Sequence, residues 1–322
     1  MKKETIIIIV LAVGLLSSVV YNLVKPQGLE ECKSDREFIS PDIACDEGSI
    51  SDKTEALKKL TDIEVEKHVK TGNVKRIAVF YRNLDNRQWF GVNENESFAP
   101  GSLLKLPLAI SYYKLAELDP TLLDRGYEYK QSYASGSLYD WQTIKPSELL
   151  VEGRTYSVKE LIYRMMKYSD NEVVPVLTGS INKSFFDKVY LDLGVYVPTT
   201  LGIEENFISV KTYAAILRAL YNSSYLNREY SNELLGIMSE SAFDTGIKAG
   251  LPYSIKLSNK FGERVFVDQA TNKIIGLELH DCGVVYADPD PYVLCIMTDG
   301  DNFGELSKVI SDISKTIYDN HQ

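Results

Sequence analysis

The chain has 322 residues, of which 44% are hydrophobic and 25% are charged, so it contains enough apolar material for a sizeable folded core. Its formal net charge is −10 at pH 7 and it has no long basic run, which argues against an extended interface with nucleic acid. The length indicates one large domain, or two small ones with additional segments.

The first 24 residues predict a membrane anchor. Lys2 and Lys3 precede an uncharged run at 5–24, which is long enough to cross a bilayer as a helix. The basic flank predicts that residues 1–4 are cytoplasmic and that the rest of the chain is exported. A cleaved signal peptide is the alternative, but no small-x-small cleavage site follows the run. We therefore expect a single-pass membrane protein whose domain is extracytoplasmic, either periplasmic or extracellular.

Residues 25–50 are predicted to form a stalk or linker, because proline and glycine recur there among acidic residues. Cys32 and Cys45 flank a short polar segment within it. Export permits a disulfide bridge between them, and two free thiols are the alternative.

Residues 51–322 are predicted to form one domain with strands near both ends and helices between them. A helix at 52–68 precedes a β-hairpin, and the long middle at 100–245 is mainly helical. The final part alternates like β-strands and ends in an amphipathic helix at 303–318. This order predicts a mixed α/β (α+β) fold, in which an antiparallel sheet is assembled from both ends and a helical lobe is inserted. The expected strands are 75–81, 88–92, 264–269, 273–286 and 292–298, and the clearest middle helices are 103–118, 158–168 and 210–220.

The remaining cysteines and the three histidines do not indicate a metal or a cofactor. Cys282 and Cys295 lie in apolar strands on either side of an Asp-Pro-Asp-Pro turn. If that turn is central, the two cysteines are not directly opposite, so we expect small core residues instead of a bridge. No spacing resembles a zinc motif. His68, His280 and His321 are not expected to form a catalytic triad, and His280 is expected to be a packed strand residue.

Two side chains at the start of the first middle helix form a candidate catalytic pair. Ser102 and Lys105 are three residues apart, so one helical turn places both on the same face. A serine hydroxyl needs a nearby base, and a lysine can be that base when burial or positive neighbours lower its pKa. The N–H groups of a helix N-terminus suit a developing oxyanion. Taken alone, the same spacing also fits an N-cap serine followed by a solvated lysine.

Two further motifs follow along the chain. Ser169 and Asn171 come directly after the helix predicted at 158–168. A hydroxyl there can relay a proton to a leaving amine and a carboxamide can orient a substrate amide, although a helix cap is the alternative.

Lys260 and Gly262 are expected to open a strand. The lysine can hold a substrate carboxylate and the glycine admits substrate backbone, whereas a surface lysine at a strand start is the alternative.

In this order, the Ser-x-x-Lys, Ser-Asp-Asn and Lys-x-Gly motifs resemble the signature of class A β-lactamases and penicillin-binding proteins. The resemblance extends over about 75–318, from the hairpin through the nucleophile helix and the lobe to the final strands and helix. It implies the β-lactamase/transpeptidase-like fold. It also implies that Ser102 is acylated, that Lys105 is its general base and that Ser169 passes the proton to the leaving nitrogen. The implied substrate-binding groups are those of Asn171, Lys260 and Gly262, and the implied oxyanion hole is the backbone N–H of Ser102 and of Glu263.

The sequence departs from that family at two points. Phe261 stands where the family has a hydroxyl residue, which normally helps to bind the β-lactam carboxylate. Class A β-lactamases also carry a glutamate on an omega-shaped loop that activates the deacylating water. The corresponding stretch at 197–207 looks shortened. Glu205 is our candidate deacylation base, with Glu204 beside it, and two solvated loop carboxylates are the alternative.

The resemblance therefore implies a serine hydrolase that opens a β-lactam through an acyl-serine intermediate, and the predicted anchor places it outside the cytoplasm. We expect a monomer without a cofactor. A D-alanyl-D-alanine carboxypeptidase acting on peptidoglycan peptides is the alternative enzyme. The short loop and Phe261 also keep open a slowly deacylating β-lactam sensor and a pseudoenzyme that binds without reacting.

Overall fold

The computed structural model describes residues 51–322 except 73, 131–141, 197–205, 269 and 272. The predicted cytoplasmic end, anchor and stalk at 1–4, 5–24 and 25–50, together with Cys32 and Cys45, lie outside the described residues. Within the part that is described, no helix is long and apolar enough to cross a bilayer.

Strands from both ends of the domain meet in one antiparallel sheet, as the sequence predicts. The sheet has five strands in the order β2-β1-β7-β6-β5, so β1 of the N-terminal hairpin pairs with β7 from near the C-terminus, and β2 forms the edge. Strands β3 and β4 pair with each other in antiparallel fashion and form a separate two-stranded sheet. The strands are β1 (Val74–Asn83), β2 (Trp89–Val92), β3 (Gly126–Glu128), β4 (Thr155–Ser157), β5 (Lys256–Val267), β6 (Ile274–Tyr286) and β7 (Tyr292–Gly300).

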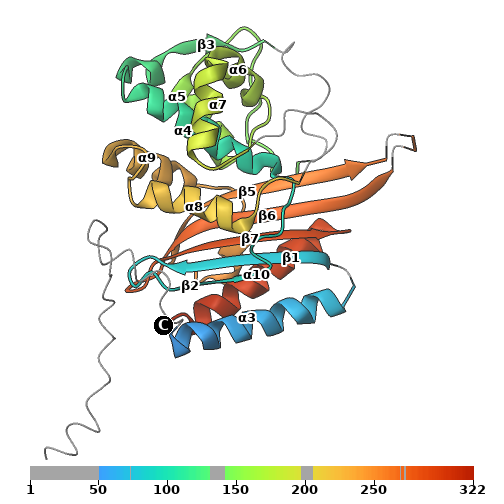
Figure 1. Cartoon of the computed structure of the whole chain (residues 1–322). Helices are drawn as coiled ribbons and strands as arrows, with labels where there is room; N and C mark the ends of the chain where they lie inside the picture. The colour runs from blue at the N-terminus through green and yellow to red at the C-terminus, as the bar shows by residue number, and fades with distance from the viewer. Residues whose placement is uncertain (1–50, 73, 131–141, 197–205, 269, 272) are drawn as a thin grey trace, which may run out of the picture. The chain divides into compact units, whose positions relative to one another are not determined.

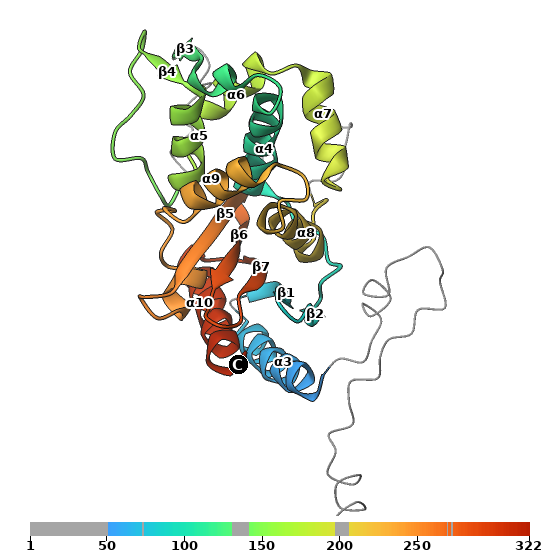
Figure 2. The ribbon, with the colours of Figure 1, turned by 90° about the vertical axis from the view of Figure 1, so that its left-hand side faces the viewer.

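The two faces of the large sheet are covered by different sets of helices. Figures 1 and 2 show α3 (Asp52–Lys70) and α10 (Phe303–Asn320) side by side on one face and the helical lobe on the other. The lobe comprises the remaining α-helices, namely α4 (Lys105–Ala116), α5 (Val158–Lys167), α6 (Val173–Ser180), α7 (Lys183–Asp192), α8 (Val210–Tyr221) and α9 (Arg228–Met238). Short 3-10 turns are η2 (Gly101–Leu104), η3 (Pro120–Asp124) and η5 (Ile247–Gly250).

The protein has a hydrophobic core on each face of the large sheet, and successive side chains of β1 contribute to the two cores in turn. Ala78 and Phe80 belong to the core shared with the lobe, whereas Ile77 and Val79 belong to the core shared with α3 and α10. Successive side chains of a strand point to opposite faces, so one strand can serve two layers. The sheet is therefore buried on both sides and provides a rigid base for the site.

Two expectations about the late strands are wrong. Cys282 and Cys295 form a disulfide, because β6 and β7 pair these two residues directly, with their Cα atoms 3.9 Å apart. Cys282 is six residues before Asp288, and Cys295 is six residues after Pro289. The hairpin of β6 and β7 therefore turns symmetrically about the Asp288–Pro289 peptide, one residue earlier than the middle of the Asp-Pro-Asp-Pro segment. The expectation that both are core residues is confirmed, because both are fully buried. The third motif also does not open a strand, since β5 begins four residues before Lys260, at Lys256.

Candidate active site

The candidate nucleophile lies on a tight turn that packs against the edge strand β5. Gly101 has a φ of +50°, and a Cβ atom built on it would lie 2.6 Å from the carbonyl oxygen of Glu263. A glycine is therefore needed both for the backbone conformation and for the close approach. Ser102 follows in η2 and is half-buried. This contact sets the nucleophile beside the backbone that was predicted to complete the oxyanion hole.

Tyrosine hydroxyls hold the carbonyl groups of the same turn. The Tyr213 hydroxyl donates to the Leu103 carbonyl at 3.1 Å, and the Tyr190 hydroxyl donates to the Leu104 carbonyl at 2.7 Å. Leu103 is fully buried. The turn that carries Ser102 is thus fixed by apolar packing below it and by hydrogen bonds from α7 and α8.

Lys105, the first residue of α4, is the candidate base, and its amine is buried. Its Nζ donates to the carbonyl oxygen of Ser169, to Ser169 Oγ at 3.0 Å and to Asn171 Oδ1 at 2.6 Å. Burial lowers the pKa of Lys105 from 10.5 to about 7, against the opposing effects of the nearby Asp170 and Glu263 carboxylates. A lysine with this pKa is partly neutral at neutral pH and can accept a proton.

Ser169 links the two lysines of the site. Its Oγ lies 3.0 Å from Lys105 Nζ and 2.9 Å from Lys260 Nζ. Lys260 is fully buried, and burial followed by repulsion from Lys105 holds its pKa well below 10.5. Ser169 itself has a left-handed φ of +54°, which is uncommon for a residue with a side chain and often marks a functional site. A hydroxyl between two amines of lowered pKa is placed to pass protons between them.

The second motif is supported from behind by a buried ion pair. The Asp170 carboxylate is fully buried and lies 2.8 Å from a guanidinium nitrogen of Arg164 on α5. Its other oxygen accepts from the Glu172 N–H at 3.0 Å, and Tyr129 donates to the Glu172 carboxylate at 2.6 Å. These bonds hold the loop between α5 and α6, from which Ser169 projects toward the lysines.

Two buried polar side chains of β6 hold the chain just before the nucleophile. Glu278 accepts from the Ala99 N–H at 2.9 Å, and His280 Nε2 donates to the Ala99 carbonyl at 2.9 Å. The second Glu278 oxygen accepts from Arg76 at 2.8 Å. His280 is fully buried, as expected of a packed residue, but it also fixes the backbone three residues from Ser102.

The residue after the third motif contributes a side chain that sequence reasoning did not consider. The Glu263 carboxylate accepts from the Thr143 N–H, at 3.3 Å from each oxygen, and burial raises its pKa.

Phe261 is fully buried and stacks on Phe243 with ring centroids 4.5 Å apart. Phe261, at the position where the family has a hydroxyl residue, is therefore part of the hydrophobic core in this protein.

The structure brings Lys105, Ser169, Asn171 and Lys260 into hydrogen-bonding contact. The backbone of Gly262 and Glu263 packs against the turn that carries Ser102. Gly262 packs tightly on the nucleophile turn, since a Cβ atom there would lie 2.8 Å from the Pro100 carbonyl. Glu205, the proposed deacylation base, and Glu204 lie outside the described residues. Sequence reasoning missed Gln142, which donates to the Ser169 carbonyl at 2.7 Å, and no local pattern marks that residue.

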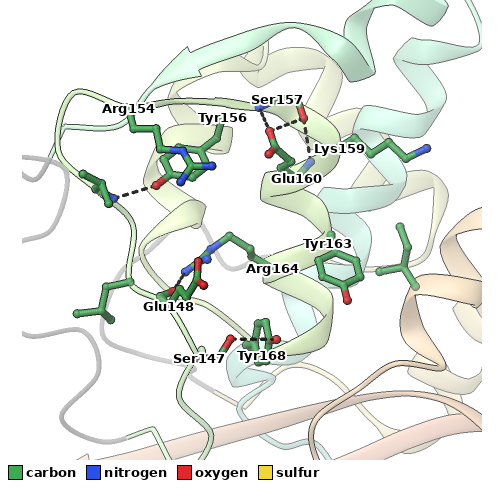
Figure 3. A pocket seen from close by; sticks show the side chains of 13 residues that line it. Ser147, Glu148, Arg154, Tyr156, Ser157, Lys159, Glu160, Tyr163, Arg164 and Tyr168 are labelled. Atoms are coloured by element: carbon green, nitrogen blue, oxygen red, sulfur yellow. Dashed lines mark hydrogen bonds between the residues drawn. The ribbon is translucent and has the colours of Figure 1, made fainter.

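A separate cavity of about 860 Å³ lies along the outer side of α5 (Figure 3). Its walls include Tyr156, Tyr163, Arg164 and Tyr168, together with the segment around Ser147, and neither Ser102 nor Lys105 lines it. Arg164 connects this wall to the buried Asp170, so the cavity adjoins the support of the second motif and not the nucleophile.

One group of side chains has the composition of a metal site but is already paired with cations. Glu64, His68 and Asp312 join α3 to α10, with His68 Nε2 at 3.0 Å from Glu64 and 3.2 Å from Asp312. Lys67 lies 2.8 Å from Glu64, and Lys308 pairs with Asp312. The lysines neutralise both carboxylates, so the group is better explained as a clamp between the two helices.

Solved structures with the same fold include penicillin-binding and β-lactamase proteins. A PBP-A point mutant in an acyl-enzyme complex with penicillin G has a TM-score of 0.66 and 18% identity, covering 82% of this chain and 96% of that one. The TLA-3 extended-spectrum β-lactamase has a TM-score of 0.69 and 17% identity, covering 82% and 98%. A β-lactamase from Chitinophaga pinensis has a TM-score of 0.68 and 19% identity, covering 81% and 99%.

Identities this low show the shared fold alone. No curated protein matches the sequence. The sequence does match the model of the Beta-lactamase enzyme family over residues 57–321, which is most of the chain. The match spans the nucleophile turn, the helical lobe and all strands of the large sheet. The chain therefore belongs to the Beta-lactamase enzyme family.

Proposed function

We propose that this protein is an extracytoplasmic serine hydrolase that opens the cyclic amide of a β-lactam through an acyl-enzyme on Ser102. The observation that carries the proposal is the buried Lys105 amine, whose pKa of about 7 suits a general base. The spacing of three residues places Lys105 and Ser102 on the same face of the helical turn. The acyl-enzyme complex of PBP-A with penicillin G, which has the same fold, supports this chemistry.

The hydrogen bonds of Ser169 with Lys105 and Lys260 support a proton path through that hydroxyl. Neutral Lys105 takes the Ser102 proton as the hydroxyl attacks the amide carbon. The backbone N–H groups of Ser102 and Glu263 stabilise the developing oxyanion, which is supported by the packing of Gly101 on the Glu263 backbone. Ser169 then gives its proton to the leaving nitrogen and recovers one from a lysine. The C–N bond breaks and the acyl group stays on Ser102.

Two observations bear on the cellular location. The uncharged run at 5–24 after Lys2 and Lys3 favours a single-pass anchor with the domain outside the cytoplasm. The buried Cys282–Cys295 disulfide supports the same placement, because such bonds persist mainly in oxidising compartments.

The test is a time course with two probes. The protein is mixed with a fluorescent penicillin and, separately, with a chromogenic cephalosporin, while the intact mass is recorded. We expect a mass increase of one ring-opened β-lactam that decays as the cephalosporin is consumed. A persistent adduct would instead indicate a penicillin-binding protein or a sensor. The absence of any adduct, together with no consumption of the cephalosporin, would contradict acyl transfer to β-lactams.

A further inference from the structure

The Glu263 carboxylate lies close enough to Lys105 and Lys260 to act on the pKa of both amines. The backbone of Glu263 touches the turn that carries the nucleophile, since its N and O atoms lie 3.5 Å and 2.6 Å from a Cβ atom built on Gly101. Its side chain is half-buried and is held by the Thr143 N–H, at 3.3 Å from each oxygen. The Thr143 side chain also hydrogen-bonds to this carboxylate. Two carboxylate oxygens can accept more hydrogen bonds than one residue supplies, so Glu263 can also accept a bond from a substrate.

The two lysine amines of the site act on the Glu263 carboxylate through space and oppose the rise of its pKa, but their hydrogen bonds go to other groups. Lys260 Nζ donates to Ser169 Oγ at 2.9 Å and to the Phe261 carbonyl at 2.7 Å, and the side chain has no exposed surface. Lys105 is similarly occupied by Ser169 and Asn171. Burial lowers the pKa of both amines, which weakens their attraction for an anion at neutral pH.

We propose that Glu263 makes the site selective for substrates that carry an ammonium or another cationic hydrogen-bond donor on the part lying along β5 beside the scissile amide, and selective against a carboxylate there. The inference rests on the proposed acyl-serine function and narrows its substrate class. A partly desolvated carboxylate attracts a cation and repels an anion far more strongly than an exposed one does. The buried phenyl ring of Phe261 adds no hydroxyl that could offset the repulsion.

The probes are three forms of one β-lactam that differ in charge at one position: benzylpenicillin, its neutral methyl ester and its cationic 2-(diethylamino)ethyl ester. Acylation rates of the full-length protein are measured by intact mass. We expect the cationic ester to react at least about tenfold faster than the free acid, with the methyl ester between them. Glu263→Gln keeps the acceptor for Thr143 and removes the charge, so it should reduce this ratio to within about threefold.

Glu66→Gln is the matched control, because it removes one negative charge from an exposed position on α3, across the sheet from the lobe. This variant should keep the wild-type ratio. A wild-type protein that prefers the free acid would overturn the proposal, and so would an unchanged ratio in Glu263→Gln. If Glu263→Gln does not fold, the ratio of the two acylation rates in the wild type still tests the predicted preference for the cationic ester.

Binding to Ser102→Ala separates this inference from the proposed function. If no probe acylates the wild type, acyl transfer to β-lactams is contradicted, but the three affinities can still be compared. Tighter binding of the cationic ester than of the free acid, lost when Glu263→Gln is added to Ser102→Ala, would support the role of Glu263. Equal affinities, or tighter binding of the free acid, would overturn it.

Discussion

At the scale of single residues, the chemistry depends on an uncharged amine at Lys105. Lys105→Ala should leave the fold intact and slow acylation by about 10²–10⁴-fold, because Ser102 loses its proton acceptor. Labelling with a penicillin probe measures the rate, and thermal unfolding checks the fold. Lys308→Ala makes the same substitution at an exposed position on α10 and should label normally. A Lys105→Ala protein that labels as fast as the wild type would contradict this role.

The pKa of the same residue predicts a pH profile. Burial lowers the pKa of Lys105 from 10.5 to about 7, so the neutral, reactive form predominates above about pH 7 and the protonated form below it. Acylation should therefore slow by about tenfold per pH unit below roughly pH 6 and level off above roughly pH 8. The acylation rate from pH 5 to 9 measures this. A profile that is flat through neutrality, or that is still rising tenfold per pH unit at pH 9, is inconsistent with a buried Lys105 base.

At the scale of elements, strand β6 positions the nucleophile through Ala99. His280→Ala removes the donor to the Ala99 carbonyl and leaves that group without its partner, at a cost of about 1–3 kcal/mol in unfolding free energy. We also expect acylation to slow by about tenfold or more, because small misplacements of reacting groups reduce rates strongly. His280→Gln, which retains an N–H donor, should recover part of the rate.

Ser314→Ala separates positioning from simple destabilisation. It also removes a buried hydrogen bond, from Ser314 Oγ to the Ile247 carbonyl at 2.9 Å, but on the side of the sheet facing α10. It should lower stability without changing the acylation rate of the folded protein. Equal rates for His280→Ala and Ser314→Ala would indicate that the Ala99 contact does not position Ser102.

The loop between α5 and α6 depends on the Arg164–Asp170 pair. Arg164→Met leaves the buried Asp170 carboxylate without its guanidinium partner, which should lower the free energy of unfolding by about 3–5 kcal/mol. Adding Asp170→Asn removes the buried charge and should recover part of that loss. Urea unfolding at pH 7 measures both. If Arg164→Met is as stable as the wild type, the pair does not support the second motif.

At the scale of the whole molecule, the sequence predicts the elements well where periodicity is strong. The helix expected at 158–168 is observed as Val158–Lys167, and the strand expected at 273–286 is observed as Ile274–Tyr286. Apolar spacing and turn residues are local properties, so one sequence suffices to locate them. The three motifs also identified the residues that meet at the site, because each motif is short and continuous.

The errors and omissions involve contacts between distant segments. The pairing of Cys282 with Cys295 depends on the register of β6 on β7, which the turn sequence did not determine. Gln142 reaches Ser169 and Thr143 reaches Glu263 only after the lobe has packed on the sheet. Such contacts leave no periodic or motif signal in a single sequence.

The measurement that tests the central claim most directly is the location of a penicillin adduct by peptide mapping in the wild type and in Ser102→Ala. The account predicts one penicilloyl group on the peptide that carries Ser102 in the wild type, and no adduct in the variant. Modification at another residue, or equal modification of Ser102→Ala, would contradict Ser102 as the nucleophile and with it the proposed mechanism.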